Sequence, residues 1–417
     1  MKPRRVVVTG LGALTPIGNT LSKYWEGLLS GTSGAAPITY FDSTHYKTQF
    51  ACEVKNFNIQ DHLDRKEARK MDRFTQYAMV STAEAINHAG IDMETLNKNR
   101  VGVIWGAGIG GLETFQNEVL GLAANNNIPR FNPFFIPKMI ADIAPGLISI
   151  KYGFGGPNFA TVSACASSSN AMIDSLNYIR LGYADMIVTG GSEAAVTKAG
   201  IGGFNAMHAL STRNDDPKTA SRPFDKYRDG FVLGEGSGTL IFESLEHALS
   251  RDAKIHAEVA AGGLSADAHH MTAPHPKGLG AKNVMINGLD NAGLNPEDID
   301  IINMHGTSTP LGDIAESQAI LSVFGDHAYK MNINSTKSMT GHLLGAAGAI
   351  EAISSIMSIK HSVVPPTINH QTPDEKIDQK IDFTFGKPKK RTVNIALSNT
   401  FGFGGHNACL IFKKYEN

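Results

Sequence analysis

The two halves of the sequence repeat one order of strands, glycine turns and helices, and this repeat constrains the fold more than any other feature. In the first half, buried strands are predicted at residues 4–9 and 100–105, and the second runs into the glycine loop 106–111. In the second half, strands at 254–262 and 299–304 follow in the same order. A constant order of parts with little identity is typical of a duplicated α/β unit. We therefore expect two halves, residues 1–252 and 253–417, whose strand ends converge on one site.

Each half also has a strand that meets a tight turn and a helix of small residues. In the first half this unit contains Cys165, and in the second half it follows the strand 332–335. The free N–H groups and the dipole of a helix N-terminus lower the pKa of a thiol placed there, which makes Cys165 a candidate nucleophile. The same N–H groups can bind an oxyanion on an attacked acyl carbon. The alternative is a buried structural cysteine, the commoner fate of a free thiol.

Composition favours a compact enzyme over a disordered or nucleic-acid-binding chain. Charged residues make up 18% of the 417 residues, and the formal net charge of −1 provides no field that would attract a polyanion. Cys52, Cys165 and Cys409 are too few and too scattered for a disulfide framework or a cysteine-rich metal site. The first ten residues read as a strand rather than a signal peptide, and the apolar run 343–359 is interrupted by Glu351. We therefore expect a cytoplasmic protein.

Two histidines occupy strand-end positions in the duplicated plan. His305 follows a buried strand, and His342 closes the turn 336–342, which also holds Lys337. Neutral imidazoles near a thiol can donate hydrogen bonds to a developing enolate or oxyanion. Metal ligation is less favoured because no carboxylate or cysteine lies at ligand spacing beside either ring. A cysteine peptidase would need one histidine with an Asn or Asp partner, and the second histidine and Lys337 argue against it.

Lys337 is the only charged residue of its turn and needs a partner if it is buried. The segment 313–316 supplies two candidate carboxylates, Asp313 and Glu316. The charge of Lys337 would then set the local field and the protonation of the two histidines.

Two glycine-rich turns are expected to border the site. The loop 106–111 matches G-x-G-x-x-G, but no acidic residue ends a following strand, so we expect a tight loop with Ile109 pointing into a pocket rather than a dinucleotide site. In the turn 401–405, glycines on both sides of Phe403 leave this ring room to move, and Phe401 precedes it. The N–H group of Phe403 is a second candidate donor to an oxyanion.

A basic cluster precedes the helix predicted at residues 74–89. Its spacing predicts one basic face on one helix, which is either a solvated surface or a docking site for an acidic protein or a phosphate-bearing substrate. The cluster consists of Arg65, Lys66, Arg69, Lys70 and Arg73.

Together these motifs resemble the condensing enzymes of fatty-acid synthesis, and among them the long-chain, type II β-ketoacyl-(acyl carrier protein) synthases. The resemblance runs from Arg4 to Lys413. It rests on Ser-Ala-Cys-Ala-Ser-Ser around Cys165, Asn-Met-His-Gly-Thr-Ser-Thr-Pro around His305, Ser-Thr-Lys-Ser-Met-Thr-Gly-His ending at His342, and Gly-Phe-Gly-Gly around Phe403. It implies an α/β, thiolase-like, five-layered α-β-α-β-α fold from two duplicated halves, and a homodimer.

The resemblance also implies a reaction. Cys165 would take an acyl group from acyl carrier protein, and His305 and His342 would assist decarboxylation of malonyl carrier protein. The enolate would then attack the acyl thioester, with the N–H groups of Cys165 and Phe403 binding the oxyanion. Lys337, with Glu316, would organise the histidines.

Further implied roles concern binding. Ile109 would line the acyl pocket with Phe401 and Phe403, and the loop 265–278, with His269 and His270, would move with the Phe403 turn. Lys66, Arg69 and Lys70 match the family's patch for carrier protein, whereas His208 stands where relatives often carry arginine. No cofactor or metal is expected, because the substrates carry their own phosphopantetheine; a structural monovalent cation is left open.

Other readings of the same residues remain. Initiating synthases use Cys, His and Asn, which the assignment of His342 disfavours, and thiolases use a second cysteine, whereas Cys409 lies inside a predicted strand. A polyketide ketosynthase of the same plan is harder to separate. A non-catalytic subunit that sets chain length would lack the nucleophile, and Cys165 is present.

Overall fold

Ten strands form one mixed sheet in the computed structural model, which describes residues 3–416; residues 1–2 and 417, the outer ends of the predicted halves, lie outside it. Its order is β10-β9-β13-β14-β8-β1-β7-β6-β4-β5. The strands of the first half are β1 (Val6–Leu14), β4 (Val101–Gly106), β5 (Asn158–Thr161), β6 (Met186–Glu193) and β7 (Gly236–Ser244). Those of the second half are β8 (Ala257–Ala266), β9 (Ile301–Asn303), β10 (Asn332–Asn334), β13 (Ile395–Gly402) and β14 (His406–Lys413). Two small ladders pair β2 (Ala36–Pro37) with β3 (Phe50–Ala51), and β11 (Val363–Val364) with β12 (Lys389–Lys390).

The two sets of five strands are arranged alike. Counted outward from the middle of the sheet, each set places its first strand innermost, then its fifth, fourth, second and third. The sets meet where β1 and β8 pair antiparallel, at Val7 with Glu258 and Val8 with Ala257. This repeated order is the one that a duplicated unit produces. The division at residue 252 remains a prediction.

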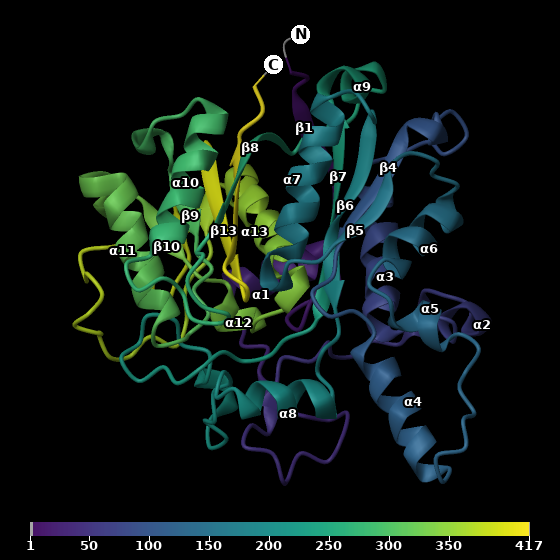
Figure 1. The fold of residues 1–417 in the computed structure, drawn as a ribbon. Coiled ribbons are helices and arrows are strands. Elements are labelled where there is room, and N and C mark those ends of the chain that lie inside the picture. The colour runs from purple at the N-terminus through teal and green to yellow at the C-terminus, as the bar shows by residue number, and fades with distance from the viewer. Residues whose placement is uncertain (1–2, 417) are drawn as a thin grey trace.

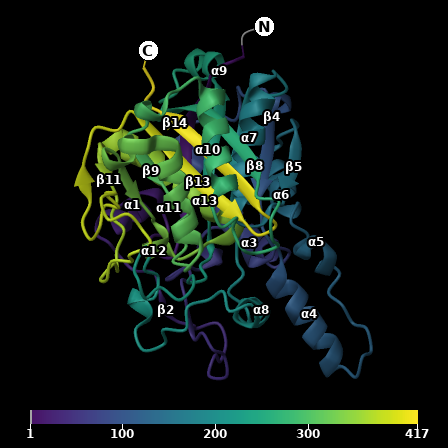
Figure 2. The same ribbon diagram turned by 60° about the vertical axis from the view of Figure 1, so that its left-hand side comes forward.

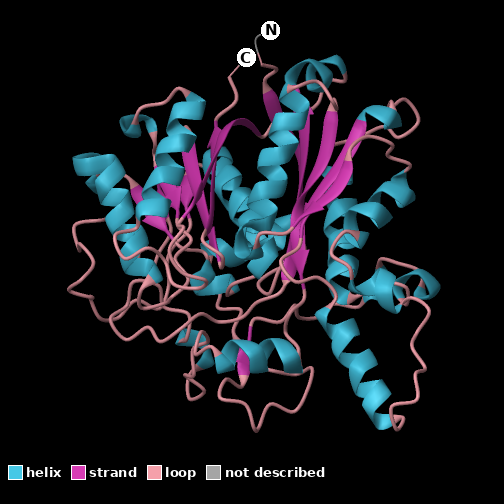
Figure 3. Ribbon diagram, in the orientation of Figure 1, coloured by secondary structure: helices cyan, strands magenta, loops and turns pink. Residues whose placement is uncertain are grey.

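Helices cover both outer faces and fill the space between the two sets of strands (Figures 1 and 3). The helices α7 and α13 form the middle layer and pack on strands of both sets, α3 and α6 cover one outer face, and α10, with α11 beside it, covers the other. The predicted five-layered thiolase-like architecture is confirmed. The helices are α1 (Leu21–Leu29), α2 (Arg65–Ala68), α3 (Arg73–His88), α4 (Leu112–Ala124), α5 (Phe135–Met139), α6 (Ile143–Tyr152), α7 (Ser167–Arg180), α8 (Lys198–Ala206), α9 (Leu245–Ser250), α10 (Leu279–Ala292), α11 (Gly312–Phe324), α12 (Lys337–Thr340) and α13 (Ala347–His361). Helix α4 projects away from the layers (Figure 2).

Small residues allow α7 and α13 to approach closely. A Cβ atom at Gly348 would collide with the Ser169 hydroxyl, and that hydroxyl lies 2.8 Å from the hydroxyl of Thr400 on β13. The Ser168 hydroxyl accepts the N–H group of Ala349 at 3.0 Å, so α7 satisfies a free donor in the first turn of α13. All residues of 347–359 are buried. Within residues 3–416, no helix combines the length and apolar content needed to cross a membrane.

The basic cluster does not lie on one helix, so that prediction is wrong. Helix α2 ends at Ala68, and Asp72 caps a new helix by accepting the N–H group of Phe74 at 3.3 Å. Arg73 points inward and pairs with Glu113 at 3.0 Å and Glu235 at 3.6 Å. The short side chain of Asp72 breaks the helical run because it satisfies the donors of the second helix. The exposed members of the cluster are Arg65, Lys66, Arg69 and Lys70.

Ile353 tests the importance of the middle layer. Its side chain on α13 has 0% exposure, so Ile353→Ala should lower the free energy of unfolding by about 2–5 kcal/mol through lost burial and a cavity. The matched control is Leu249→Ala on α9, where the side chain is 52% exposed and the change should stay within about 0.5 kcal/mol. Urea unfolding of both variants measures the difference, and equal small losses would contradict this packing.

Candidate active site

Cys165 lies in a single 3-10 turn, 164–166, that leads directly into α7. The preceding residue, Ala164, has a φ of +51°, a strained conformation that is typical of functional turns. The second half contains the same device in the turn 344–346 before α13, where Leu344 has a φ of +46°. The prediction that Cys165 stands at the start of the helix is confirmed.

Two backbone N–H groups lie near the sulfur of Cys165 and act to lower the pKa of its thiol: its own and that of Phe403. Phe403 belongs to the turn between β13 and β14, which Gly404 and Gly405 close with φ values of +88° and +75°. A Cβ atom at Gly402 would lie only 2.6 Å from the Ser163 carbonyl oxygen, so glycine is needed for this turn to rest on the Cys165 turn. Two N–H groups placed in this way are candidate donors for an oxyanion hole.

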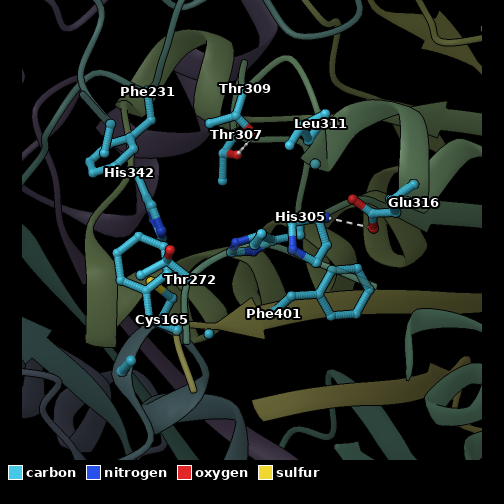
Figure 4. Close-up of a pocket in the computed structure, with 18 of the residues that line it drawn as sticks. Cys165, Phe231, Thr272, His305, Thr307, Thr309, Leu311, Glu316, His342 and Phe401 are labelled. Carbon is cyan, nitrogen blue, oxygen red and sulfur yellow. Dashed lines mark hydrogen bonds between the residues drawn. The ribbon is translucent and has the colours of Figure 1, made fainter. Parts of the chain in front are cut away.

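His305 and His342 face each other beside Cys165. Their ring centroids are 5.2 Å apart and nearly perpendicular at 84°, and both side chains reach toward the space in front of the sulfur (Figure 4). The N–H group of His342 donates to the Val232 carbonyl at 2.8 Å, which fixes the backbone of that turn. Burial, and then the positive charge of Lys337, hold the pKa of both imidazoles well below 6.5. Both rings are therefore neutral at neutral pH and able to donate one hydrogen bond each.

Glu316 holds the backbone of His305 rather than the ammonium of Lys337. Its two carboxylate oxygens accept the N–H groups of His305 and Gly306, each at 2.9 Å, and the amide of Asn399 at 3.1 Å. Burial raises the pKa of this carboxyl to about 7, and the N–H donors oppose that rise. Glu316 therefore orients His305 through its main chain.

The ion pair of Lys337 is formed with Glu351 on α13, so the predicted pairing with Glu316 or Asp313 is wrong. Asp313 is already bound to the Arg228 guanidinium at 3.3 Å and to the N–H group of Phe224 at 2.9 Å. Both Lys337 and Glu351 are 1% exposed. The only sequence signal for this partner is a single charge, Glu351, inside the apolar run 343–359.

The pKa of Cys165 is raised, which corrects the prediction of a lowered value. Burial raises the pKa of the thiol to about 12, and the negative charge of Glu193 adds to this rise, although Lys337 and the two backbone N–H groups act in the opposite direction. The helix terminus was expected to dominate, but removal of the thiolate from water costs more than these donors return. A proton acceptor must therefore assist the attack, and the neutral imidazoles line the same cavity.

One cavity of about 680 Å³ collects most of the predicted residues. The predicted members in its wall are Ile109, Cys165, His208, His305, Glu316, His342, Phe401 and Phe403. Lys337 and Asp313 lie outside the cavity, and Lys66, Arg69 and Lys70 lie on the surface. Within residues 3–416, no group of three or more His, Cys, Asp or Glu side chains is arranged to hold a metal ion.

The loop between β8 and α10 closes one side of the cavity. Its members Thr272 and His275 line the wall, and the ring of His269 packs on His275 with centroids 5.2 Å apart. The N–H group of Gly404 donates to the Met271 carbonyl at 2.8 Å, and that of Asp267 donates to the Gly405 carbonyl at 2.9 Å. The loop and the Phe403 turn are thus hydrogen-bonded to each other, as motion together would require.

Comparisons with known proteins agree with this geometry. The family described as "Beta-ketoacyl synthase, N-terminal domain" matches residues 3–248, and its C-terminal counterpart matches residues 256–371. A protein of Synechocystis sp. named 3-oxoacyl-[acyl-carrier-protein] synthase 2 is 50% identical over 416 residues, which cover 100% of this chain and 99% of the relative.

Two solved ketosynthase structures are more distant in sequence. The ishigamide ketosynthase/chain length factor is 35% identical with a TM-score of 0.92, and the match covers 99% of this chain and 100% of that one. A type II polyketide ketosynthase in complex with its acyl-carrier protein is 31% identical with a TM-score of 0.90 and the same coverage.

Alkylation of Cys165 tests its corrected pKa. Cys165 should react before Cys52 and Cys409, because it is 7% exposed at the cavity whereas the others are 1% and 0% exposed. Because burial raises its pKa to about 12, the rate should keep rising with pH above neutrality. Peptide mapping after iodoacetamide treatment at several pH values measures this rate. A rate that reaches a plateau near pH 7 would show that the pKa of the Cys165 thiol is lowered after all.

Proposed function

The chain belongs to the beta-ketoacyl synthase family, and we propose that it joins an acyl group on Cys165 to malonyl carrier protein in a decarboxylating Claisen condensation. The products are a 3-oxoacyl carrier protein, lengthened by two carbons, and carbon dioxide. The observation that carries the proposal is the placement of one thiol, two neutral imidazoles and two backbone donors around one cavity. Each group has a role in one of the two steps.

The first step transfers the acyl group to Cys165. The sulfur attacks the thioester carbon, its proton passes to one neutral imidazole, and the carrier thiol leaves with that proton. The negative charge on the thioester oxygen is bound by the N–H groups of Cys165 and Phe403, which are already in place. Lys337 adds a buried positive charge that favours the thiolate as it forms.

The second step uses both imidazoles as donors. The malonyl thioester loses its carboxylate as carbon dioxide, and the electron pair left behind forms an enolate whose oxygen accepts hydrogen bonds from His305 and His342. Two neutral donors in a buried site stabilise this charge without protonating the carbon. The enolate carbon then attacks the acyl thioester, and the Cys165 thiolate leaves and takes up one proton from solvent, which balances the loss of the carboxylate as carbon dioxide.

Lys66, Arg69 and Lys70 are proposed as the docking surface for acyl carrier protein. They are exposed on and just after α2, and their positive charges suit an acidic partner. His208 at the cavity wall adds a weaker contact than an arginine would, because an imidazole lacks the forked donors of a guanidinium. The substrate's own phosphopantetheine would enter the cavity that Cys165 and the Thr272 loop line.

A homodimer is proposed through the edge strand β5. Among the residues 3–416 that the structure describes, this strand pairs with β4 alone, and its other edge is open. Large apolar side chains beside it are unusually exposed for a monomer. They are Ile150 at 77%, Val162 at 63%, Leu181 at 73% and Tyr183 at 62%. We also place the enzyme in the cytoplasm, where its three free thiols would stay reduced.

The chemistry needs no cofactor, but we propose candidate ligands for a structural monovalent cation among buried oxygen atoms on three neighbouring elements. Asn303 and Ser398 are register partners on β9 and β13, and Glu351 lies on α13, which packs on β13. Asn303 Oδ1, Glu351 Oε2 and Ser398 Oγ are buried without a hydrogen-bond partner in the part of the chain that the structure describes. Oxygen ligands of this kind suit a hard cation.

Fatty-acid elongation is favoured over polyketide synthesis by sequence. The relative named 3-oxoacyl-[acyl-carrier-protein] synthase 2 is 50% identical, against 31% for the type II polyketide ketosynthase. A non-catalytic chain-length subunit is disfavoured, because the chain retains both the nucleophile and the donors around it.

The histidine pair separates the two steps. His342→Ala should still accept an acyl group, since either imidazole can take the thiol proton, but condensation should fall by about 10²–10⁴-fold because the enolate loses a donor. Mass spectrometry of acyl-Cys165 and carbon dioxide release from malonyl carrier protein measure the two steps. Cys165→Ala is the control, and product at the wild-type level from that variant would refute the proposal.

Charge reversal tests the docking surface. Lys66→Glu with Arg69→Glu should raise the KM for carrier-protein substrates by about tenfold and leave KM for small acyl thioesters unchanged, because only the carrier protein reaches this surface. The difference should shrink at high salt. Lys390→Glu, another exposed lysine on β12, is the matched control. An equal rise for both substrate types would exclude docking as the cause.

A further inference from the structure

Glu193 is a buried carboxylate to which the two proposed steps assign no role, although its negative charge helps to raise the pKa of the Cys165 thiol. It ends β6 and is 0% exposed. Its Oε2 accepts the N–H group of Gly108 at 2.8 Å and that of Gly345 at 3.1 Å, while Oε1 accepts those of Ile109 at 3.2 Å and Gly110 at 3.1 Å. Four backbone donors on one carboxylate leave it fully hydrogen-bonded.

These bonds join two segments that the chain does not connect directly. Gly108, Ile109 and Gly110 belong to the loop after β4 in the first half, whereas Gly345 belongs to the turn before α13 in the second half. The backbones are in direct contact, because a Cβ atom at Gly345 would collide with the N atom of Gly108. Glu193 is therefore the polar link across this contact, and the loop keeps its place through it.

The loop held in this way carries a wall of the acyl cavity. Ile109 is 40% exposed and lines the cavity together with Cys165, Gly108 and Leu344. The other end of the loop is held where the N–H group of Gly111 donates to the Met139 carbonyl at 3.0 Å. With one end tied at Met139 and the middle at Glu193, the position of the Ile109 side chain depends on both.

A purely structural role would explain why a carboxylate is buried, but not why this carboxylate binds the loop beside the nucleophile. Burial raises the pKa of Glu193 to about 7 against the pull of four N–H groups, so the site retains a costly group where an apolar residue could fill the space. A carboxylate can accept all four loop donors at once, which no neutral side chain does. What it provides is a fixed loop beside the nucleophile.

We infer that Glu193 is a positioning residue that sets acyl-chain specificity, by tying the Ile109 loop to the Gly345 turn. The inference rests on the proposed condensing activity. A short acyl group on Cys165 contacts the loop little, whereas a long chain must pack along Ile109. Loss of the link should therefore penalise long chains more than short ones.

Glu193→Gln is the first test. The amide replaces one acceptor oxygen by an NH₂ group, which cannot accept the two backbone N–H groups that this oxygen binds. The ratio of kcat/KM for myristoyl carrier protein to that for acetyl carrier protein should fall at least about fivefold. Glu84→Gln is the matched control: this carboxylate also accepts two backbone N–H groups, those of Ala13 and Leu21, but does not line the cavity. Its ratio should remain that of the wild type.

A second variant tests the same inference if Glu193→Gln does not fold. In Gly108→Ala the added Cβ would lie 2.7 Å from Glu193 Oε2 and would push the carboxylate away while keeping its charge. The same fall in the chain-length ratio is expected. An equal loss for both acyl lengths, or an unchanged ratio in either folded variant, overturns the inference. A wild-type protein that forms no ketoacyl product would instead overturn the proposed function on which it rests.

Discussion

The close contact of α7 and α13 is the constraint on which the site depends. Gly348 and Ser169 can meet only because neither has a large side chain, and Ser168 satisfies a donor at the start of α13. The contact brings the first turns of both helices to one place, with Cys165 before one and Gly345 before the other. Larger residues at these positions would separate the helices and move the nucleophile away from the histidines of the other half.

The electrostatics of the site follow from burial. Taking the thiol and the two imidazoles out of water favours their neutral forms. The positive charge of Lys337 lowers the pKa of all three groups, which favours the thiolate and the neutral imidazoles. Neutral imidazoles are what a decarboxylation needs as donors, whereas a neutral thiol is a poor nucleophile. The protonation states of the free enzyme therefore suit the decarboxylation step. The acyl transfer to Cys165 depends on removal of the thiol proton during the attack.

Much of this site could be predicted from the sequence because its signals are local. A strand followed by a glycine or a catalytic residue, as at Cys165, His305 and Phe403, is visible within a few residues, and the repeat of these units predicts that they converge. The partner of Lys337 was missed because the oxygens of Asp313 and Glu316 are already bound to Arg228 and to backbone N–H groups, and the sequence does not show these bonds. The raised pKa of Cys165 depends on burial by several segments, and the break at Asp72 depends on a single cap that competes with a regular charge pattern.

The matching turns 164–166 and 344–346 show how a symmetric plan comes to hold one reaction centre. Cys165 and Gly345 occupy equivalent positions, so the architecture offers two places for a nucleophile. The second place is closed, because any side chain at Gly345 would strike the loop that borders the first. The second copy of the turn therefore forms a wall of the site rather than a second reaction centre. The first copy carries the nucleophile Cys165, and the second carries Gly345, whose lack of a side chain leaves room for the loop beside the nucleophile.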